Sequence, residues 1–118
     1  MPKDYRFYRK VVQFLKKELP CGYPVSVRRV NMDKKYDGRC WKQGKKFYIE
    51  IARELDEWKA VDVLLHEWAH AYGWHDRLHE AKDDELFNRL SHDPLWGCCY
   101  AEVYSRYEKH FTQSKTRC

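Results

Sequence analysis

The stretch Val61-Asp62-Val63-Leu64-Leu65-His66-Glu67-Trp68-Ala69-His70-Ala71-Tyr72 decides how the rest of this chain is arranged. It contains the pattern His-Glu-x-x-His, in which His66 and His70 are one helical turn apart. On a helix, residues i and i+4 lie on the same face. Two imidazoles at this spacing can bind one Zn²⁺ from the same side, and Glu67 can reach a water on the metal.

The apolar residues of this stretch indicate that the predicted helix has a buried side. The two histidines fall roughly opposite that side when the residues are placed at about 100° each. We therefore expect the apolar side to anchor the helix in a core while the histidines face a cleft. The residues of the apolar side are Val61, Leu64, Leu65, Trp68 and Tyr72.

Two further helices are predicted towards the ends of the chain. Residues 4–19 have apolar side chains at helical spacing, and Asp4 can cap the first turn. Residues 94–111 follow Asp93, a good N-cap, and begin with a proline, which suits the first helical position. The buried side of this last helix is predicted to consist of Trp96, Cys99, Tyr100, Val103, Tyr107 and Phe111.

Three short strands are predicted between the first helix and the histidine motif. Residues 25–30 alternate apolar and polar side chains, residues 36–41 form a second strand, and residues 47–51 form the clearest one. Residues 43–45 have the composition of a hairpin turn. We expect an α+β fold with a small, mostly antiparallel three-stranded sheet packed against the N-terminal helix, the histidine-motif helix and the C-terminal helix.

Residues 1–118 are expected to form a single domain, with 83–90 as a further short helix and 112–118 as a frayed tail. The apolar fraction of 43% and the aromatic fraction of 16% exclude a disordered chain. The formal charge of +5 is compatible with a nucleic-acid partner but does not require one.

The sequence gives no sign of a membrane or secretory protein. It has no run of about 18 apolar residues and no hydrophobic leader, so we expect no membrane association. The five cysteines include no Cys-x-x-Cys pair, which argues against a second, structural zinc site. Reduced thiols in the cytoplasm are the simplest expectation.

A catalytic zinc site usually has three protein ligands and a water in the fourth position. The favoured third ligand is His92, which precedes the last helix in the compact stretch His92-Asp93-Pro94-Leu95-Trp96. Asp76 would complete a metzincin-like pattern, but that class needs a methionine turn downstream, and both methionines of this chain lie upstream. Glu102 on the last helix is a further alternative. The surface histidines are predicted to be His75, His79 and His110.

Four segments of the chain follow the order of a known family: Gly38-Arg39-Cys40, residues 47–51, residues 64–71, and residues 92–96. Together they resemble the SprT-like zinc metallopeptidases, which include the Spartan type of DNA–protein crosslink protease. The family pattern is His-Glu-x-x-His followed later by His-x-Pro-x-aromatic, and the likeness covers roughly residues 25–105. Asp93 stands where the family commonly has glycine. The sequence contains neither a zinc ribbon nor a DNA-binding tail, so a compact stand-alone form of the kind encoded by bacteria or phages is expected.

The resemblance implies a zincin-like fold and a zinc metalloendopeptidase with one catalytic Zn²⁺ held by His66, His70 and His92. Glu67 would activate a zinc-bound water for attack on a protein or peptide substrate. The candidate donors to the developing oxyanion are Tyr100, Tyr104 and Arg106. Residues 47–51 are a candidate edge for an extended substrate. The alternatives are a non-catalytic zinc-stabilised adaptor and a nucleic-acid-associated binding protein.

Overall fold

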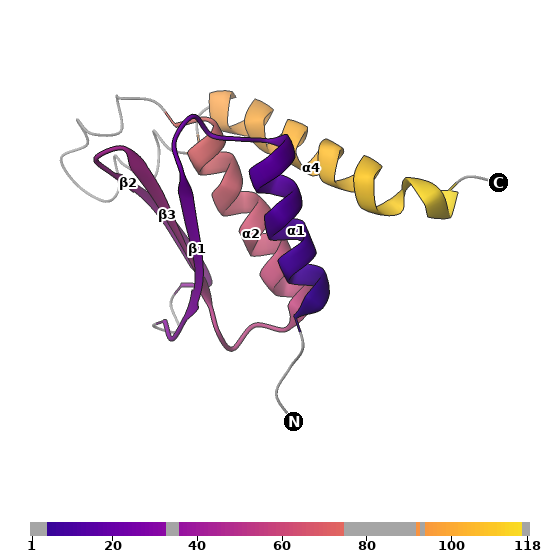
Figure 1. Ribbon diagram of the computed structural model, residues 1–118, viewed down its shortest axis with the longest axis horizontal. Helices are drawn as coiled ribbons and strands as arrows, with labels where there is room; N and C mark the ends of the chain where they lie inside the picture. The colour runs from indigo at the N-terminus through magenta and orange to yellow at the C-terminus, as the bar shows by residue number, and fades with distance from the viewer. Residues whose placement is uncertain (1–4, 33–35, 75–91, 93, 117–118) are drawn as a thin grey trace.

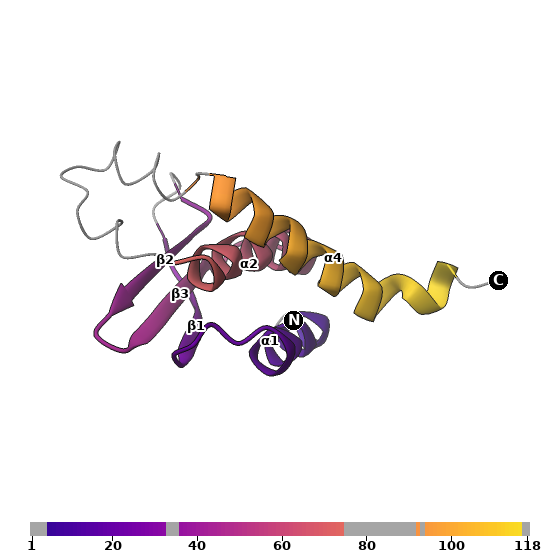
Figure 2. The same cartoon turned by 90° about the horizontal axis from the view of Figure 1, so that it is seen from above.

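The computed structural model describes residues 5–32, 36–74, 92 and 94–116. These residues form the helices α1 (Arg6–Glu18), α2 (Glu57–Tyr72) and α4 (Pro94–Thr116), and the strands β1 (Val25–Val30), β2 (Gly38–Gln43) and β3 (Lys46–Ala52). The strands make one sheet, and the three helices lie on one side of it (Figures 1 and 2). The predicted α+β class is confirmed.

The sheet is mixed rather than mostly antiparallel, because β3 lies between β1 and β2. β3 pairs antiparallel with β2 across a tight hairpin and parallel with β1. The strand is strongly apolar, with Phe47, Ile49, Ile51 and Ala52 at most 2% exposed. A central position buries these side chains and gives both backbone edges of β3 a partner.

The central position of β3 also corrects the expectation that residues 47–51 offer an edge to an extended substrate. Both edges of this strand are already hydrogen-bonded within the sheet. The outer strands are β1 and β2.

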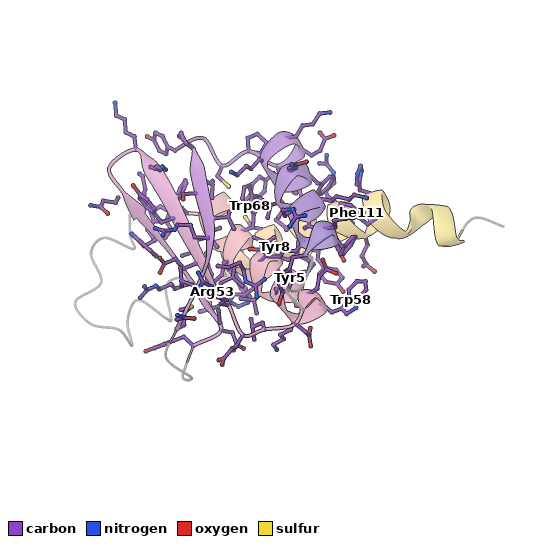
Figure 3. The ribbon with its side chains drawn as sticks, turned by 60° about the horizontal axis from the view of Figure 1, so that its bottom comes forward. Tyr5, Tyr8, Arg53, Trp58, Trp68 and Phe111 are labelled. Atoms are coloured by element: carbon purple, nitrogen blue, oxygen red, sulfur yellow. The ribbon has the colours of Figure 1, made fainter. Side chains whose placement is uncertain are left out.

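Helix α2 packs against the sheet and against both other helices, and its apolar residues are almost completely buried. Asp56 caps its start, with the side chain accepting a hydrogen bond of 2.8 Å from the backbone N–H of Lys59. The indole N–H of Trp68 donates to the carbonyl of Leu19 at 3.0 Å and so ties α2 to the end of α1. Figure 3 places Trp68 and Tyr8 in the interior between the sheet and the helices. The residues of α2 that are at most 1% exposed are Ala60, Val61, Leu64, Leu65, Trp68, Ala69 and Ala71.

The loop between β3 and α2 is held by Arg29 of β1. One guanidinium nitrogen of Arg29 donates to the carbonyls of Ala52, Arg53 and Leu55, each at 3.0 Å. The backbone N–H of Tyr8 donates to the Glu57 carboxylate in the first turn of α2 at 3.1 Å. These bonds fix where α2 begins and therefore where its histidines lie relative to the sheet.

Helix α4 packs on α2 and continues to Thr116, beyond the predicted end at residue 111. The expected frayed tail is therefore helical as far as Thr116. Val103 is buried on the predicted side, and Trp96 and Tyr100 are half-buried there. No described helix is long and apolar enough to cross a bilayer. The predicted cap residues Asp4 and Asp93 and the predicted helix at 83–90 lie outside the described residues.

Candidate metal centre

Three histidine side chains converge at one end of the α2–α4 interface. His66 and His70 come from one face of α2, and His92 comes from the residues just before α4. The Nε2 atom of His66 lies 3.2 Å from Nε2 of His70 and 3.4 Å from Nε2 of His92. The three ligand atoms all lie within 4.8 Å of one another, and among the described residues no other such group of potential ligands occurs.

The spacing of these nitrogens fits a tetrahedral metal site. Zn–N bonds of about 2.0–2.1 Å at tetrahedral angles place two ligand nitrogens about 3.3–3.4 Å apart. A single proton between two imidazoles can satisfy only one such pair, whereas a divalent cation can accept all three lone pairs. Imidazole donors suit zinc and also copper, iron and nickel. The His66–His70–His92 group can therefore hold a metal ion.

The surroundings of His66 favour the neutral imidazole that a metal ligand requires. The half-buried position of the ring lowers its pKa, and the neighbouring His92 lowers it further. A neutral ring at neutral pH keeps a lone pair available for a cation.

Glu67 is the buried polar side chain in the core of the described protein, at 8% exposure. Burial raises the pKa of its carboxyl to about 7. Glu67 lines a cleft of about 380 Å³ together with His66 of the same helix, Gly38 of β2 and Tyr100 of α4. A carboxyl with a pKa near neutrality, beside a candidate metal ligand, can both accept and return a proton.

Gly38 lets β2 approach α2 closely beside Glu67. A Cβ atom added at Gly38 would lie 2.6 Å from Cγ1 of Val63 and 3.4 Å from Cγ of Glu67. A side chain at this position would therefore displace Val63 and press on the carboxylate arm.

Trp96 of α4 contacts all three histidine rings. Its centroid lies 5.0 Å from that of His66, 5.3 Å from His70 in a stacked arrangement, and 4.8 Å from His92. Its other stacked neighbour is Tyr100, at 5.2 Å and 11°. The sequence predicted Trp96 only as a core residue. Its position four residues after His92, at the start of a helix, is the signal that could have placed it in the site.

The structure separates the remaining candidates. Tyr100 lines the cleft, and its ring centroid lies 6.0 Å from that of His66. Tyr104 is 37% exposed and does not line the cleft. Glu102 is an exposed residue 4.0 Å from Arg106 and is not part of the histidine group.

Of the other histidines, His110 is exposed as predicted and stacks on Phe14 at 4.4 Å. Asp76, His75 and His79 lie outside the described residues.

The described residues thus place three imidazoles, a buried carboxyl and a tyrosine around one open cleft. The candidate centre is built from α2, β2 and the first turns of α4. Comparisons of the chain with protein-family models, with curated proteins and with solved structures gave no match.

Proposed function

We propose that this chain is a zinc-dependent metalloendopeptidase of the SprT-like type, which hydrolyses peptide bonds in protein substrates. The observation that supports it most is the convergence of three histidine Nε2 atoms at the cleft that Glu67 also lines. The order of the two sequence motifs, His-Glu-x-x-His and His-x-Pro-x-Trp, supports the same family.

Zinc is the proposed metal because three neutral imidazoles at tetrahedral spacing, with an open fourth direction, are typical of its catalytic sites. When bound, zinc supplies Lewis acidity and makes water a better nucleophile at neutral pH. The protein's own part is to hold the three rings. Trp96 restricts their movement by packing against all of them.

Glu67 is the proposed general base. Its carboxylate takes a proton from the attacking water and then passes it to the leaving amine. Burying a carboxyl at 8% exposure without an ion pair destabilises the fold, and a purely structural metal site gains nothing from it. This observation favours the enzyme over a zinc-stabilised adaptor.

Tyr100 is the proposed donor to the developing oxyanion, in preference to Tyr104. Burial, with Asp62 and Tyr104 nearby, raises the pKa of Tyr100, so its hydroxyl keeps the proton it would donate. Stacking on Trp96 holds the ring at the cleft. An extended peptide is proposed to pair with β2, the outer strand whose first residue, Gly38, borders the cleft.

The test is metal content and peptide hydrolysis measured on the same preparations. Wild-type protein should bind one zinc per chain and cleave members of a peptide library. Glu67→Gln should keep the zinc and lose roughly 10²- to 10⁴-fold in rate, the usual contribution of a positioned acid–base group. Glu54→Gln, a change at an exposed glutamate in the turn after β3, is the matched control and should change neither.

Two outcomes would contradict the proposal. Cleavage by Glu67→Gln at the wild-type rate would remove Glu67 from the mechanism. A wild-type protein that binds zinc, hydrolyses nothing in the library and shows no spectral change with hydroxamate after cobalt substitution would be the adaptor instead.

A further inference from the structure

The face of the sheet turned away from the helices has a chemistry of its own. Phe47, Ile49 and Ile51 are buried against the helices, so the alternate residues Tyr48 and Glu50 point to the opposite side. The strand register places Trp41 and Arg39 of β2 beside Tyr48 and Glu50 on that side. It places Ser26 and Arg28 of β1 there as well. We call this surface the outer face: Ser26, Arg28, Arg39, Trp41, Lys46, Tyr48 and Glu50.

Two aromatic rings stack at the centre of the outer face. The Trp41 and Tyr48 centroids are 5.4 Å apart, and the ring planes differ by 14°. The Arg39 guanidinium lies 5.3 Å from the Trp41 centroid, and the Lys46 ammonium lies 5.3 Å from the Tyr48 centroid. A cation therefore stands next to each ring of the pair.

The charge on the outer face is positive. Arg39 donates to the Glu50 carboxylate at 2.7 Å, so these two charges offset each other. Arg28 and Lys46 are exposed and form no ion pair with any residue that the structure describes. The three described helices all lie on the other side of the sheet and leave the aromatic pair uncovered by them (Figure 2).

We infer that the outer face binds single-stranded nucleic acid. Unpaired bases stack on exposed aromatic rings, and phosphates bind the cations that flank those rings. A duplex keeps its base faces inside the helix and offers no ring to Trp41 and Tyr48. A protein partner would be expected to meet an apolar centre, whereas this face has cations next to its rings and no aliphatic centre.

This inference does not depend on the proposed peptidase. The histidines lie on α2 and before α4, on the opposite side of the sheet from the aromatic pair. The competing explanation is that the Trp41–Tyr48 pair only stabilises the sheet, as cross-strand aromatic pairs do. The two explanations differ in what a substitution does to binding.

The first experiment measures fluorescence anisotropy of labelled oligonucleotides of about 20 nucleotides, long enough for one binding site. The protein is kept in EDTA, so that metal plays no part. Oligo(dT) and oligo(rU) distinguish DNA from RNA, a duplex tests for unpaired bases, and inorganic polyphosphate competes on charge alone. Wild-type protein should bind at least one single strand, bind the duplex more weakly, and resist polyphosphate.

The aromatic test is Trp41→Leu against Trp58→Leu, a tryptophan 65% exposed at the start of α2. Trp41→Leu should weaken single-strand binding roughly 5- to 150-fold, the range measured for one base–aromatic stack, and Trp58→Leu should not. Thermal unfolding of each variant shows whether it is folded. Binding by folded Trp41→Leu equal to wild type would overturn the inference.

The charge test stays decisive even if Trp41→Leu does not fold. The double substitution Arg28→Gln with Lys46→Gln should lower the slope of log affinity against log salt by about 1.4, as expected for two single-strand phosphate contacts. Lys10→Gln with Lys17→Gln on α1 changes the net charge equally and should leave the slope unchanged. Equal effects of the two pairs, wild-type protein that binds no single strand at low salt, or displacement by polyphosphate as readily as by oligonucleotide would each refute a built site.

Discussion

Replacing Glu67 with glutamine should make the metal-free protein more stable at neutral pH. The folded-state pKa of Glu67 is about 7, against an ordinary value of 4.5, because the carboxyl is buried. Below about pH 4.5 the carboxyl is neutral in both states, and its burial costs nothing extra. As the pH rises from there to about 7, the unfolded chain releases this proton while the folded chain retains it, so stability falls with pH.

The size of the effect follows from the pKa difference. At about 1.4 kcal/mol per unit, the carboxyl should cost the fold roughly 3 kcal/mol at pH 8 and almost nothing at pH 4.5. Glutamine has nearly the same shape and no such charge. With a denaturant slope of about 2 kcal/mol/M, the urea midpoint of Glu67→Gln should exceed that of wild type by about 1.5 M at pH 8.

The assay is urea unfolding in EDTA at about pH 5, 6, 7 and 8, spanning the titration. The histidines titrate in both proteins, so their contributions cancel in the difference to a first approximation. Glu54→Gln, which changes an exposed carboxylate, should track wild type at every pH. A Glu67→Gln difference that is the same at pH 5 and pH 8 would refute the reasoning, because it would show that burial does not perturb this carboxyl.

Three further outcomes are expected. His92→Ala should weaken zinc affinity more than about a hundredfold in chelator competition, since losing even a residue behind a ligand costs 10- to 100-fold, while His110→Ala should not; equal affinities would place the third ligand elsewhere. Trp96→Ala should raise the zinc Kd about 10- to 100-fold and Trp96→Phe much less, because the ring packs on all three imidazoles; an unchanged Kd for Trp96→Ala would make the contact incidental. Gly38→Ala should cost about 1–3 kcal/mol in urea unfolding because its Cβ would lie 2.6 Å from Val63, and adding Val63→Ala should recover part of that loss; additive losses would mean that the strand moves instead.

Local periodicity was enough to predict the three described helices and the approximate positions of the strands. The apolar side of α2 was predicted residue by residue, because 3.6-residue periodicity depends only on neighbours in the sequence. The parallel pairing of β1 with β3 could not be predicted in this way. It depends on which strand gains most from the centre of the sheet, and the alternating pattern of Val25–Val30 is the same for a parallel and an antiparallel partner.

The candidate site was predicted in its ligands but not in its surroundings. The i, i+4 rule placed His66 and His70 on one face, and the compact stretch at His92 suggested the third ligand; the structure brings all three together. The burial of Glu67 was not predicted, because it results from the close approach of β2 at Gly38, a contact between residues far apart in the chain. The packing of Trp96 on the histidines likewise depends on how α4 docks on α2.

The two parts of the histidine group lie on separate stretches of backbone, with 22 residues from His70 to His92. An ion gripped by both parts closes that interval into a ring, much as a disulfide would. A ring of this size restricts an open chain by roughly 3 kcal/mol of conformational entropy. The packing of α4 on α2 meets that cost before any ion arrives, so tight docking and tight ion binding rise and fall together. The concentration of chelator needed to strip the ion would then serve as a gauge of how firmly the first turn of α4 is seated.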